Sequence, residues 1–147
     1  MTRERLPDDR QGMTQKFTIT ARRPRRQGEP DGTEEIDGYI KVNCYPDGRL
    51  GEIFLWIGKP GSTEAMYDQW AIAVSMALQH GATVDVLFGK HLGTRFEPSG
   101  AVQGVEGVRS CTSLLDLVAR WVIGRYGEKK EELVETEPVV VTLPVGS

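Results

Sequence analysis

The chain has 147 residues, enough for one domain built around a single hydrophobic core. Its formal net charge of −3 gives no overall bias towards nucleic acids or membrane surfaces. No apolar run approaches the roughly 20 residues needed to span a bilayer, and the first residues lack the apolar core of a signal peptide, so we expect a cytoplasmic protein without a membrane partner.

Cys44 and Cys111 are the only cysteines, and two free thiols are expected rather than a disulfide in a reducing compartment. Together with His80 and His91 they show no close spacing of the kind that a zinc site requires. The sequence therefore predicts neither a metal site nor another cofactor.

Three strands are predicted in the first half of the chain. Residues 15–21 alternate apolar and polar side chains, which is typical of a half-buried strand. Residues 39–45 and 51–58 flank the turn signature Pro46-Asp47-Gly48 and predict an antiparallel hairpin. The near-continuous apolar run in the second strand of this hairpin predicts a central strand that is covered on both faces.

The chain divides into an arm, a domain and a tail. Residues 1–14 are interpreted as an N-terminal arm and residues 15–126 as the domain. Within it, residues 22–37 hold two prolines, two glycines and a switch from basic to acidic side chains, which predicts a flexible loop. Residues 127–147 are a charged tail, in which the run 139–143 is either an edge strand or a segment that reaches a neighbouring subunit.

Helices are predicted over residues 63–80, 83–92 and 110–126. In the first, the apolar stripe is predicted to run through Met66, Trp70, Ala73 or Val74, and Ala77, and Gly81 ends the helix in a left-handed turn. In the third, the stripe is made by Leu114, Leu117, Val118, Trp121 and Val122.

The order of these elements, strands first and helices after, predicts an α+β fold: a small antiparallel sheet of about three strands with two to three helices packed on it. Three strands are a poor cover for two sizeable amphipathic helices, so a homo-oligomer is expected.

The first candidate ligand site is the loop from Gly58 to Thr63, which leads from a strand into the longest helix. Backbone N–H groups and the positive end of the helix dipole favour an anion there. Lys59 adds a point charge, Gly61 is one of the glycines of this loop, and the hydroxyls of Ser62 and Thr63 are potential donors. The lysine precedes the second glycine, so this is not a P-loop. A tight turn followed by an ordinary helix cap explains the same residues.

Two further candidates carry an arginine. Arg95 and Phe96 lie in an irregular segment, where a guanidinium clamps a phosphate and an aromatic ring stacks on a base; a structural role, with Arg95 paired to an acid, is equally open. Arg109 and Ser110 stand at the predicted start of the last helix, where a cation is unfavourable unless an anion compensates it. A ligand phosphate, a carboxylate such as Asp116, or solvent would each provide that compensation.

Five segments of the chain stand in a characteristic order: Arg5-Leu6-Pro7-Asp8-Asp9-Arg10-Gln11-Gly12-Met13-Thr14-Gln15-Lys16-Phe17, Gly38-Tyr39-Ile40-Lys41-Val42, Gly51-Glu52-Ile53-Phe54, Lys59-Pro60-Gly61-Ser62-Thr63 and Thr94-Arg95-Phe96-Glu97-Pro98-Ser99-Gly100. Together they resemble the TSCPD domain near the C-terminus of adenosylcobalamin (vitamin B12)-dependent, class II ribonucleotide reductases. The resemblance covers roughly residues 3–125, and relative to that family residues 22–37 are an insertion. The catalytic barrel of those enzymes has no counterpart here.

The resemblance implies two main hypotheses for function. Ribonucleotide reduction needs a thiyl-radical cysteine and a reducing pair, which two cysteines cannot supply, so no enzyme is predicted. The first hypothesis is a non-catalytic nucleotide-binding module, in its narrowest form an oligomeric sponge that sequesters a cyclic-nucleotide or cyclic ADP-ribose immune signal in phage anti-defence.

The alternative is an accessory or regulatory subunit of a split adenosylcobalamin-dependent reductase, docked on a separate catalytic chain. The retention of residues 5–17 favours this alternative, because the matching stretch of the full-length enzymes joins their catalytic body to this domain. The lack of a Cys-x-x-Cys pair in the tail counts against it. A third hypothesis is a structural protein that exchanges residues 139–143 between subunits.

Overall fold

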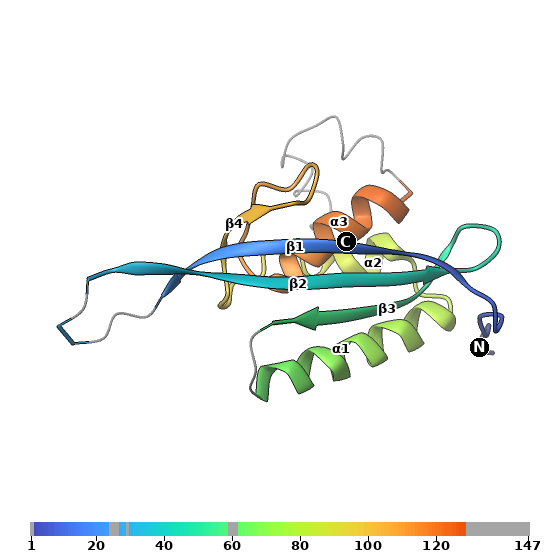
Figure 1. Cartoon of the computed structure of the whole chain (residues 1–147). Coiled ribbons are helices and arrows are strands. Elements are labelled where there is room, and N and C mark those ends of the chain that lie inside the picture. Colours follow the sequence, from blue (N-terminus) through green and yellow to red (C-terminus); the bar gives the residue numbers. More distant parts are fainter. Residues whose placement is uncertain (1, 24–26, 29, 59–61, 129–147) are drawn as a thin grey trace.

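The computed structural model describes residues 2–23, 27–28, 30–58 and 62–128, which form an antiparallel sheet with helices packed on it (Figure 1). The strands are β1 (Gln11–Arg23), β2 (Gly32–Cys44), β3 (Leu50–Ile57), β4 (Gly100–Gln103) and β5 (Ser110–Cys111). The helices are α1 (Ser62–Gln79), α2 (Val84–Gly89) and α3 (Leu114–Tyr126). The predicted α+β class is confirmed.

The sheet has five strands in the order β3-β2-β1-β4-β5 among the described residues, where about three were predicted. The two strands that the prediction missed are four and two residues long. β4 lies in residues 94–107, whose glycines and proline indicated irregular structure, and β5 lies at the start of the predicted helix 110–126. Such short strands carry too few alternating positions to be recognised, and here they form because β1 offers an edge for β4 to pair with.

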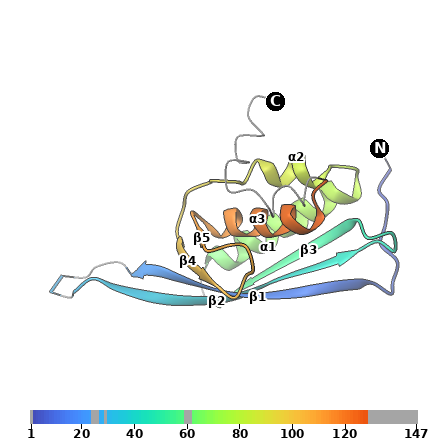
Figure 2. The same ribbon diagram turned by 90° about the horizontal axis from the view of Figure 1, so that it is seen from above.

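The helices α1, α2 and α3 lie on one side of the sheet (Figure 2). Alternate side chains of the three long strands point to that side and form the core with the helices; the most deeply buried of them are Phe17, Ile19, Ile40, Val42 and Ile53. Phe17 packs over Gly38, its direct partner on β2. A Cβ atom added at Gly38 would stand 2.4 Å from the Phe17 ring, so this position needs a glycine.

The prediction of a flexible loop over residues 22–37 is wrong for residues 22–23 and 32–37, which belong to β1 and β2; residues 24–26 and 29 lie outside the described residues. β1 and β2 pair along their full length, from Gln11 opposite Cys44 to Arg23 opposite Gly32. The far end of this hairpin extends past the helices (Figures 1 and 2), so polar residues are tolerated on both of its faces. That is why its acidic composition indicated a loop, although Ile36 is buried and the ladder continues.

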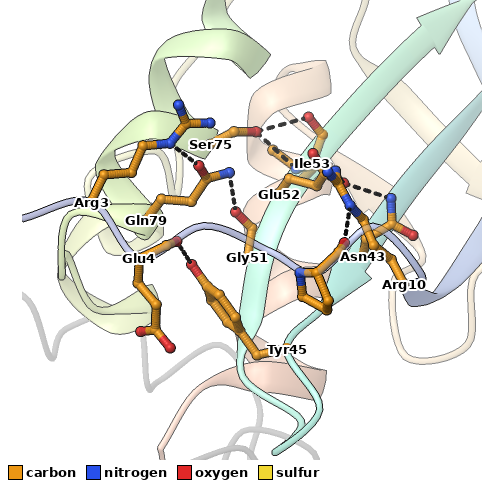
Figure 3. Close-up of polar contacts among 11 residues, drawn as sticks. Arg3, Glu4, Arg10, Asn43, Tyr45, Gly51, Glu52, Ile53, Ser75 and Gln79 are labelled. Carbon is orange, nitrogen blue, oxygen red and sulfur yellow. Dashed lines mark hydrogen bonds and ion pairs between the residues drawn. The ribbon is translucent and has the colours of Figure 1, made fainter.

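The prediction that residues 51–58 form a central strand covered on both faces is also wrong, because β3 is the edge strand next to β2. Side chains of α1 satisfy part of its free backbone edge (Figure 3). Ser75 Oγ accepts a hydrogen bond from Ile53 N (2.9 Å) and donates one to Ile53 O (3.2 Å), and Gln79 Nε2 donates to Gly51 O (3.0 Å). The helix thereby blunts an edge that would otherwise be open to pairing.

The first helix is confirmed within one residue at each end, and Gly81 follows it with a φ of 102° as predicted. Its apolar stripe was only partly predicted. The buried residues are Tyr67, Ala71, Val74 and Leu78, whereas Met66 is 68% exposed. Because α1 carries apolar side chains on both faces, periodicity alone could not identify the inner one.

The last helix begins at Leu114 rather than at residue 110. Ser113 is its N-cap, with its Oγ accepting from Asp116 N at 3.0 Å. Its predicted apolar stripe is confirmed as buried. Arg109 and Ser110, by contrast, are not at a helix N-terminus: Ser110 is in β5 and pairs with Ala101. Arg109 is exposed to solvent just before β5, so its charge does not meet the positive end of a helix dipole as predicted.

Residues 3–10 pack on the outer end of β3 and α1 (Figure 3), and the last four residues of the predicted arm belong to β1. Glu4 N donates to Gln79 O (2.8 Å), and Tyr45 OH donates to Glu4 O (2.5 Å). Leu6 is buried against Gly51, where an added Cβ would stand 2.6 Å from the leucine side chain. Of the predicted tail, residues 129–147, with the run 139–143, lie outside the described residues.

Candidate functional site: an aromatic and cationic sheet face

The sheet face opposite the helices carries three large aromatic side chains in the midst of otherwise polar residues. Strand register places them in two adjacent cross-strand rows. One row is Lys16, Tyr39 and Trp56, and the next is Thr14, Lys41 and Phe54. We call these six residues the sheet-face patch. All but Lys16 line one depression of about 370 Å³.

The aromatic rings of the patch are about half exposed. The exposed fractions are 39% for Tyr39, 48% for Phe54 and 46% for Trp56. The Tyr39 and Trp56 rings pack with centroids 5.4 Å apart and planes tilted by 39°. Single exposed apolar residues are common on protein surfaces, whereas a contiguous group in a depression is typical of a binding site.

The charge of the patch is positive, and the rows on either side of it carry carboxylates. Lys16 and Lys41 are exposed, and neither forms an ion pair with a described residue. Beyond Lys41 and Phe54, the next row ends in Glu52, which pairs with Arg10 at 2.6 Å. Beyond Tyr39 and Lys16, the next row contains Asp37, which accepts from Thr18 Oγ1 at 2.7 Å. Among the described residues of β1, β2 and β3, the lysines without an ion pair therefore lie in these two rows.

This combination suits a planar, anionic ligand. Exposed aromatic rings provide stacking area for a heterocycle, and each ammonium group neutralises a phosphate or carboxylate. The strands fix these side chains on a rigid surface, since β1, β2 and β3 are paired over most of their length.

The first site predicted from the sequence is only partly placed. Lys59 and Gly61 lie outside the described residues, and Ser62 and Thr63 are the first two residues of α1. An anion at this loop therefore stays a prediction. Gly58, the first residue of the loop, donates its N–H to Asp37 O at 2.7 Å.

The other two predicted sites come close together in space. Phe96 N donates to Thr112 O (3.1 Å) and Thr112 Oγ1 donates to Thr94 O (2.8 Å), which ties the loop to the end of β5. Arg95, Phe96, Arg109 and Ser110 are all exposed. Neither arginine side chain bonds to a described residue, so the choice between ligand binding and a solvated role stays open for this pair.

Asp116, considered above as a counter-charge for Arg109, has a different role. It is 1% exposed and accepts hydrogen bonds from Gly93 N (2.7 Å), Thr112 N (3.0 Å) and Arg120 Nε (3.1 Å). This carboxylate therefore holds both ends of the segment that contains Arg95 and Phe96. The signal available in the sequence was the Ser113-to-Asp116 spacing, in which an acid three residues after a capping serine marks a helix start.

Both cysteines are free thiols, as predicted. Burial raises the pKa of Cys111 to about 11 and also raises the pKa of Cys44. Each thiol is therefore protonated at neutral pH and is a poor nucleophile.

Within the described residues, His, Cys, Asp and Glu side chains nowhere gather in threes as a metal site would need. No helix in that part of the chain has the length and apolar character to cross a bilayer.

The sequence analysis missed the sheet-face patch. Phe54 and Trp56 lie in the apolar run that was interpreted as covered on both faces, and Tyr39 and Lys41 lie in the strand beside it. The signal that could have identified the patch is Lys41, which lies two residues after Tyr39 on β2 and therefore on the same face of the sheet. A lysine there is incompatible with a face covered by helices.

Comparison with known proteins matches residues 5–124 to the TSCPD domain. The chain is similar to vitamin B12-dependent ribonucleotide reductases of Rhodopirellula baltica (39% identity over 121 residues), Agrobacterium fabrum (37% over 125) and Streptantibioticus cattleyicolor (40% over 119). These alignments cover 82%, 84% and 80% of the chain but 10%, 9% and 17% of the respective relatives. No solved structure matches the chain.

Proposed function

Because the chain belongs to the TSCPD domain family and its relatives are ribonucleotide reductases, we propose that it is a non-catalytic module that binds a nucleotide on the sheet-face patch. One observation carries the proposal: three half-exposed aromatic rings lie beside two unpaired lysines on the open face of the sheet. Stacking of a base on an aromatic side chain contributes about 1–3 kcal/mol. The ammonium groups add attraction for the phosphate.

One observation supports binding without turnover. Burial raises the pKa of both thiols, to about 11 for Cys111, which disfavours the thiolate. Sequestration of a cyclic-nucleotide or cyclic ADP-ribose signal is a narrower form of the same proposal, which the choice of test ligands addresses.

The test has two arms. Protein purified from cells is denatured and the supernatant is searched for released nucleotides by mass spectrometry. Ligand-free protein is then titrated by calorimetry with nucleoside mono-, di- and triphosphates, cyclic dinucleotides and cyclic ADP-ribose. We expect one of these classes to bind and to raise the melting temperature in a dose-dependent way.

Variants locate the site. Trp56→Ala and Tyr39→Ala each weaken binding by about 1–3 kcal/mol, roughly 5- to 150-fold in Kd. Val86→Ala is the matched control, because Val86 is an exposed apolar side chain (67%) on α2, on the helix side of the sheet. A protein that carries no nucleotide and binds none of these ligands would refute the proposal.

A second candidate function is supported by the alignments. In its relatives the matched stretch is part of a much longer chain, which favours an accessory role on a separate catalytic chain. We place that contact on the exposed aromatic rings of the sheet-face patch. Co-purification of a reductase catalytic chain, lost in Trp56→Ala and retained in Val86→Ala, would support this function. Nucleotide binding by the isolated protein would favour the first.

Self-association is a further part of the proposal. α1 exposes Met66, Ile72 and Met76 to solvent, an apolar surface on the helix side of the molecule. Sedimentation of the wild type and of Ile72→Glu tests it: the proposal expects an oligomer that the glutamate dissociates, and a wild-type monomer contradicts it.

A further inference from the structure

We propose that the sheet-face patch selects a mononucleotide in one orientation, with its base over β3 and its phosphates over β2 and β1, and that it disfavours single-stranded nucleic acid. This inference rests on the proposed function and names the ligand class for the same site. Three features of the patch carry it: the order of its side chains across the strands, its length along the strands, and the charges at its two ends.

Across the strands, the patch changes from apolar to cationic. Phe54 and Trp56 are on the edge strand β3, Lys41 and Tyr39 are on β2, and Lys16 is on β1 beside Thr14. Neighbouring strands are about 4.8 Å apart, so the outer rings and the lysine of β1 are separated by about 10 Å. That span matches a nucleotide laid across the strands, with the base on the rings of β3 and the 5′-phosphates at the lysines.

Along the strands, the patch has room for one base. Its two rows are two residues apart on each strand, which is about 7 Å. The three rings lie next to one another within this length, and the ring centroids of Tyr39 and Trp56 are 5.4 Å apart. A second stacked base would have to lie over the next row, where Asn43 donates to Glu52 at 2.8 Å, or over the row that contains Asp37.

The charges at the two ends oppose a longer phosphate chain. Asp37 flanks the patch on one side, with its carboxylate bonded to the neutral hydroxyl of Thr18. Glu52 flanks it on the other, and there the guanidinium of Arg10 is already engaged by the glutamate. Phosphates that continue in either direction meet a carboxylate or a neutralised pair, and the net charge of −3 gives a polyanion no long-range attraction.

Two consequences can be measured. Affinity should rise with the number of phosphates at a fixed base, because the phosphates reach Lys41 and Lys16. It should not rise with the number of nucleotides, because additional phosphates leave the cationic rows. On a surface that binds single strands, a cationic groove follows the backbone, so affinity rises with the number of nucleotides.

The experiment is a titration of the full chain, followed by tryptophan fluorescence and calorimetry. The probes are nucleosides, their monophosphates and triphosphates for each of the four common bases, and homo-oligonucleotides of five and ten nucleotides. For the preferred base we expect the triphosphate to bind at least 10-fold more tightly than the nucleoside. The ten-nucleotide strand should bind no more tightly, per molecule, than the triphosphate.

Variants test the orientation and the boundary separately. Lys16→Gln/Lys41→Gln should remove most of the preference for the triphosphate while leaving nucleoside affinity within about 2-fold, and Lys90→Gln, an exposed lysine at the end of α2, should leave both unchanged. Asp37→Asn should strengthen binding of the ten-nucleotide strand more than binding of the triphosphate. Circular dichroism confirms that each variant is folded.

The outcomes separate this inference from the proposed function. If affinity increases with oligonucleotide length, or if the lysine variant keeps the full phosphate preference, the mononucleotide assignment is overturned although the domain binds nucleotides. If no nucleoside, nucleotide or oligonucleotide binds, both fail together.

Discussion

Replacement of Asp116 by asparagine is the sharpest test of how the helices and the loop that carries Arg95 are held. The two carboxylate oxygens accept from the backbone N–H groups of Gly93 and Thr112 and from the Arg120 guanidinium. Asparagine keeps one acceptor oxygen and turns an NH₂ group towards one of these backbone donors. It also removes the counter-charge of Arg120.

The magnitude follows from these contacts. A buried donor left without an acceptor costs about 1–3 kcal/mol, and breaking a buried ion pair costs about 3–5 kcal/mol. The Arg120 side chain is 29% exposed, so water takes over part of its solvation and the lower part of that range applies. We expect Asp116→Asn to lower the free energy of unfolding by about 3 kcal/mol, a large part of the 5–15 kcal/mol typical of a domain.

Urea unfolding followed by circular dichroism measures this difference, and the dependence of the free energy on urea should be unchanged. Asp68→Asn is the control, because Asp68 is an exposed carboxylate on α1 and its replacement should stay within about 0.5 kcal/mol of the wild type. Hydrogen exchange should accelerate at the Gly93 and Thr112 amides. If Asp116→Asn is as stable as Asp68→Asn, the carboxylate does not hold the loop and this reasoning is wrong.

Three further predictions concern the arm, pH and the thiols. Leu6→Ala should destabilise the domain by about 2 kcal/mol in the same assay, because Leu6 is buried against Gly51; a change below about 0.5 kcal/mol would show that the arm is not packed in solution. Burial lowers the pKa of His91 from 6.5, and its ring accepts from Trp70 Nε1 at 3.0 Å, so the unfolded chain takes up the proton more readily. Its contribution to stability is therefore full above pH 6.5 and is lost as the pH falls through the lower folded-state pKa. The melting temperature should fall less between pH 7.5 and 5.5 in His91→Gln than in the wild type, and equal falls contradict the assignment. Because burial raises the pKa of Cys111 to about 11, only about one thiol in a thousand is ionised at pH 8. In Cys44→Ser, Ellman's reagent should react slowly with the native protein and rapidly in urea, whereas rapid reaction of the native protein would contradict a buried thiol.

The parts of the fold that could be predicted are those in which local pattern and tertiary environment agree. α3 is an example: every apolar residue of its predicted stripe is buried, because one of its faces meets the sheet. The pattern of α1 was harder to interpret, since Met66 and Ile72 are apolar yet exposed. Periodicity shows that apolar side chains recur along a helix, but it does not show which of two apolar faces packs on the sheet.

The β1–β2 hairpin shows the opposite limit. Its outer half, with Glu34, Glu35 and Asp37, has the composition of a loop and the backbone pairing of a strand. Cross-strand hydrogen bonds form there because the inner half fixes the register, with Ile19 opposite Ile36 as the last buried pair. A short stretch of sequence does not reveal this pairing, because the register is set by partner residues on the other strand, about twenty positions away.

The candidate site was missed for a related reason. Tyr39, Phe54 and Trp56 lie within strands, whereas the anion sites predicted from the sequence are loops and helix starts, the first of which begins two residues after Trp56. Their significance comes from strand order: β3 is an edge strand, and the described helices cover only the opposite face. Arg95 and Phe96 were expected on an irregular loop, but their proximity to Arg109 was not predicted. What holds that loop is the buried carboxylate of Asp116, which the sequence suggested only as a counter-charge for Arg109.

The packing of residues 3–10 changes the balance between the two functional hypotheses. Retention of this segment favoured an accessory subunit, on the ground that an independent binding protein has little need of it. In the structure Leu6 fills the space above Gly51, Glu4 and Arg49 form an ion pair at 2.8 Å, and Arg10 pairs with Glu52 at the end of the sheet-face patch. A domain of either kind needs these contacts to close the edge of its core and to neutralise Glu52. The segment therefore no longer discriminates between the two hypotheses, and what separates them is whether the sheet face binds a nucleotide or a protein.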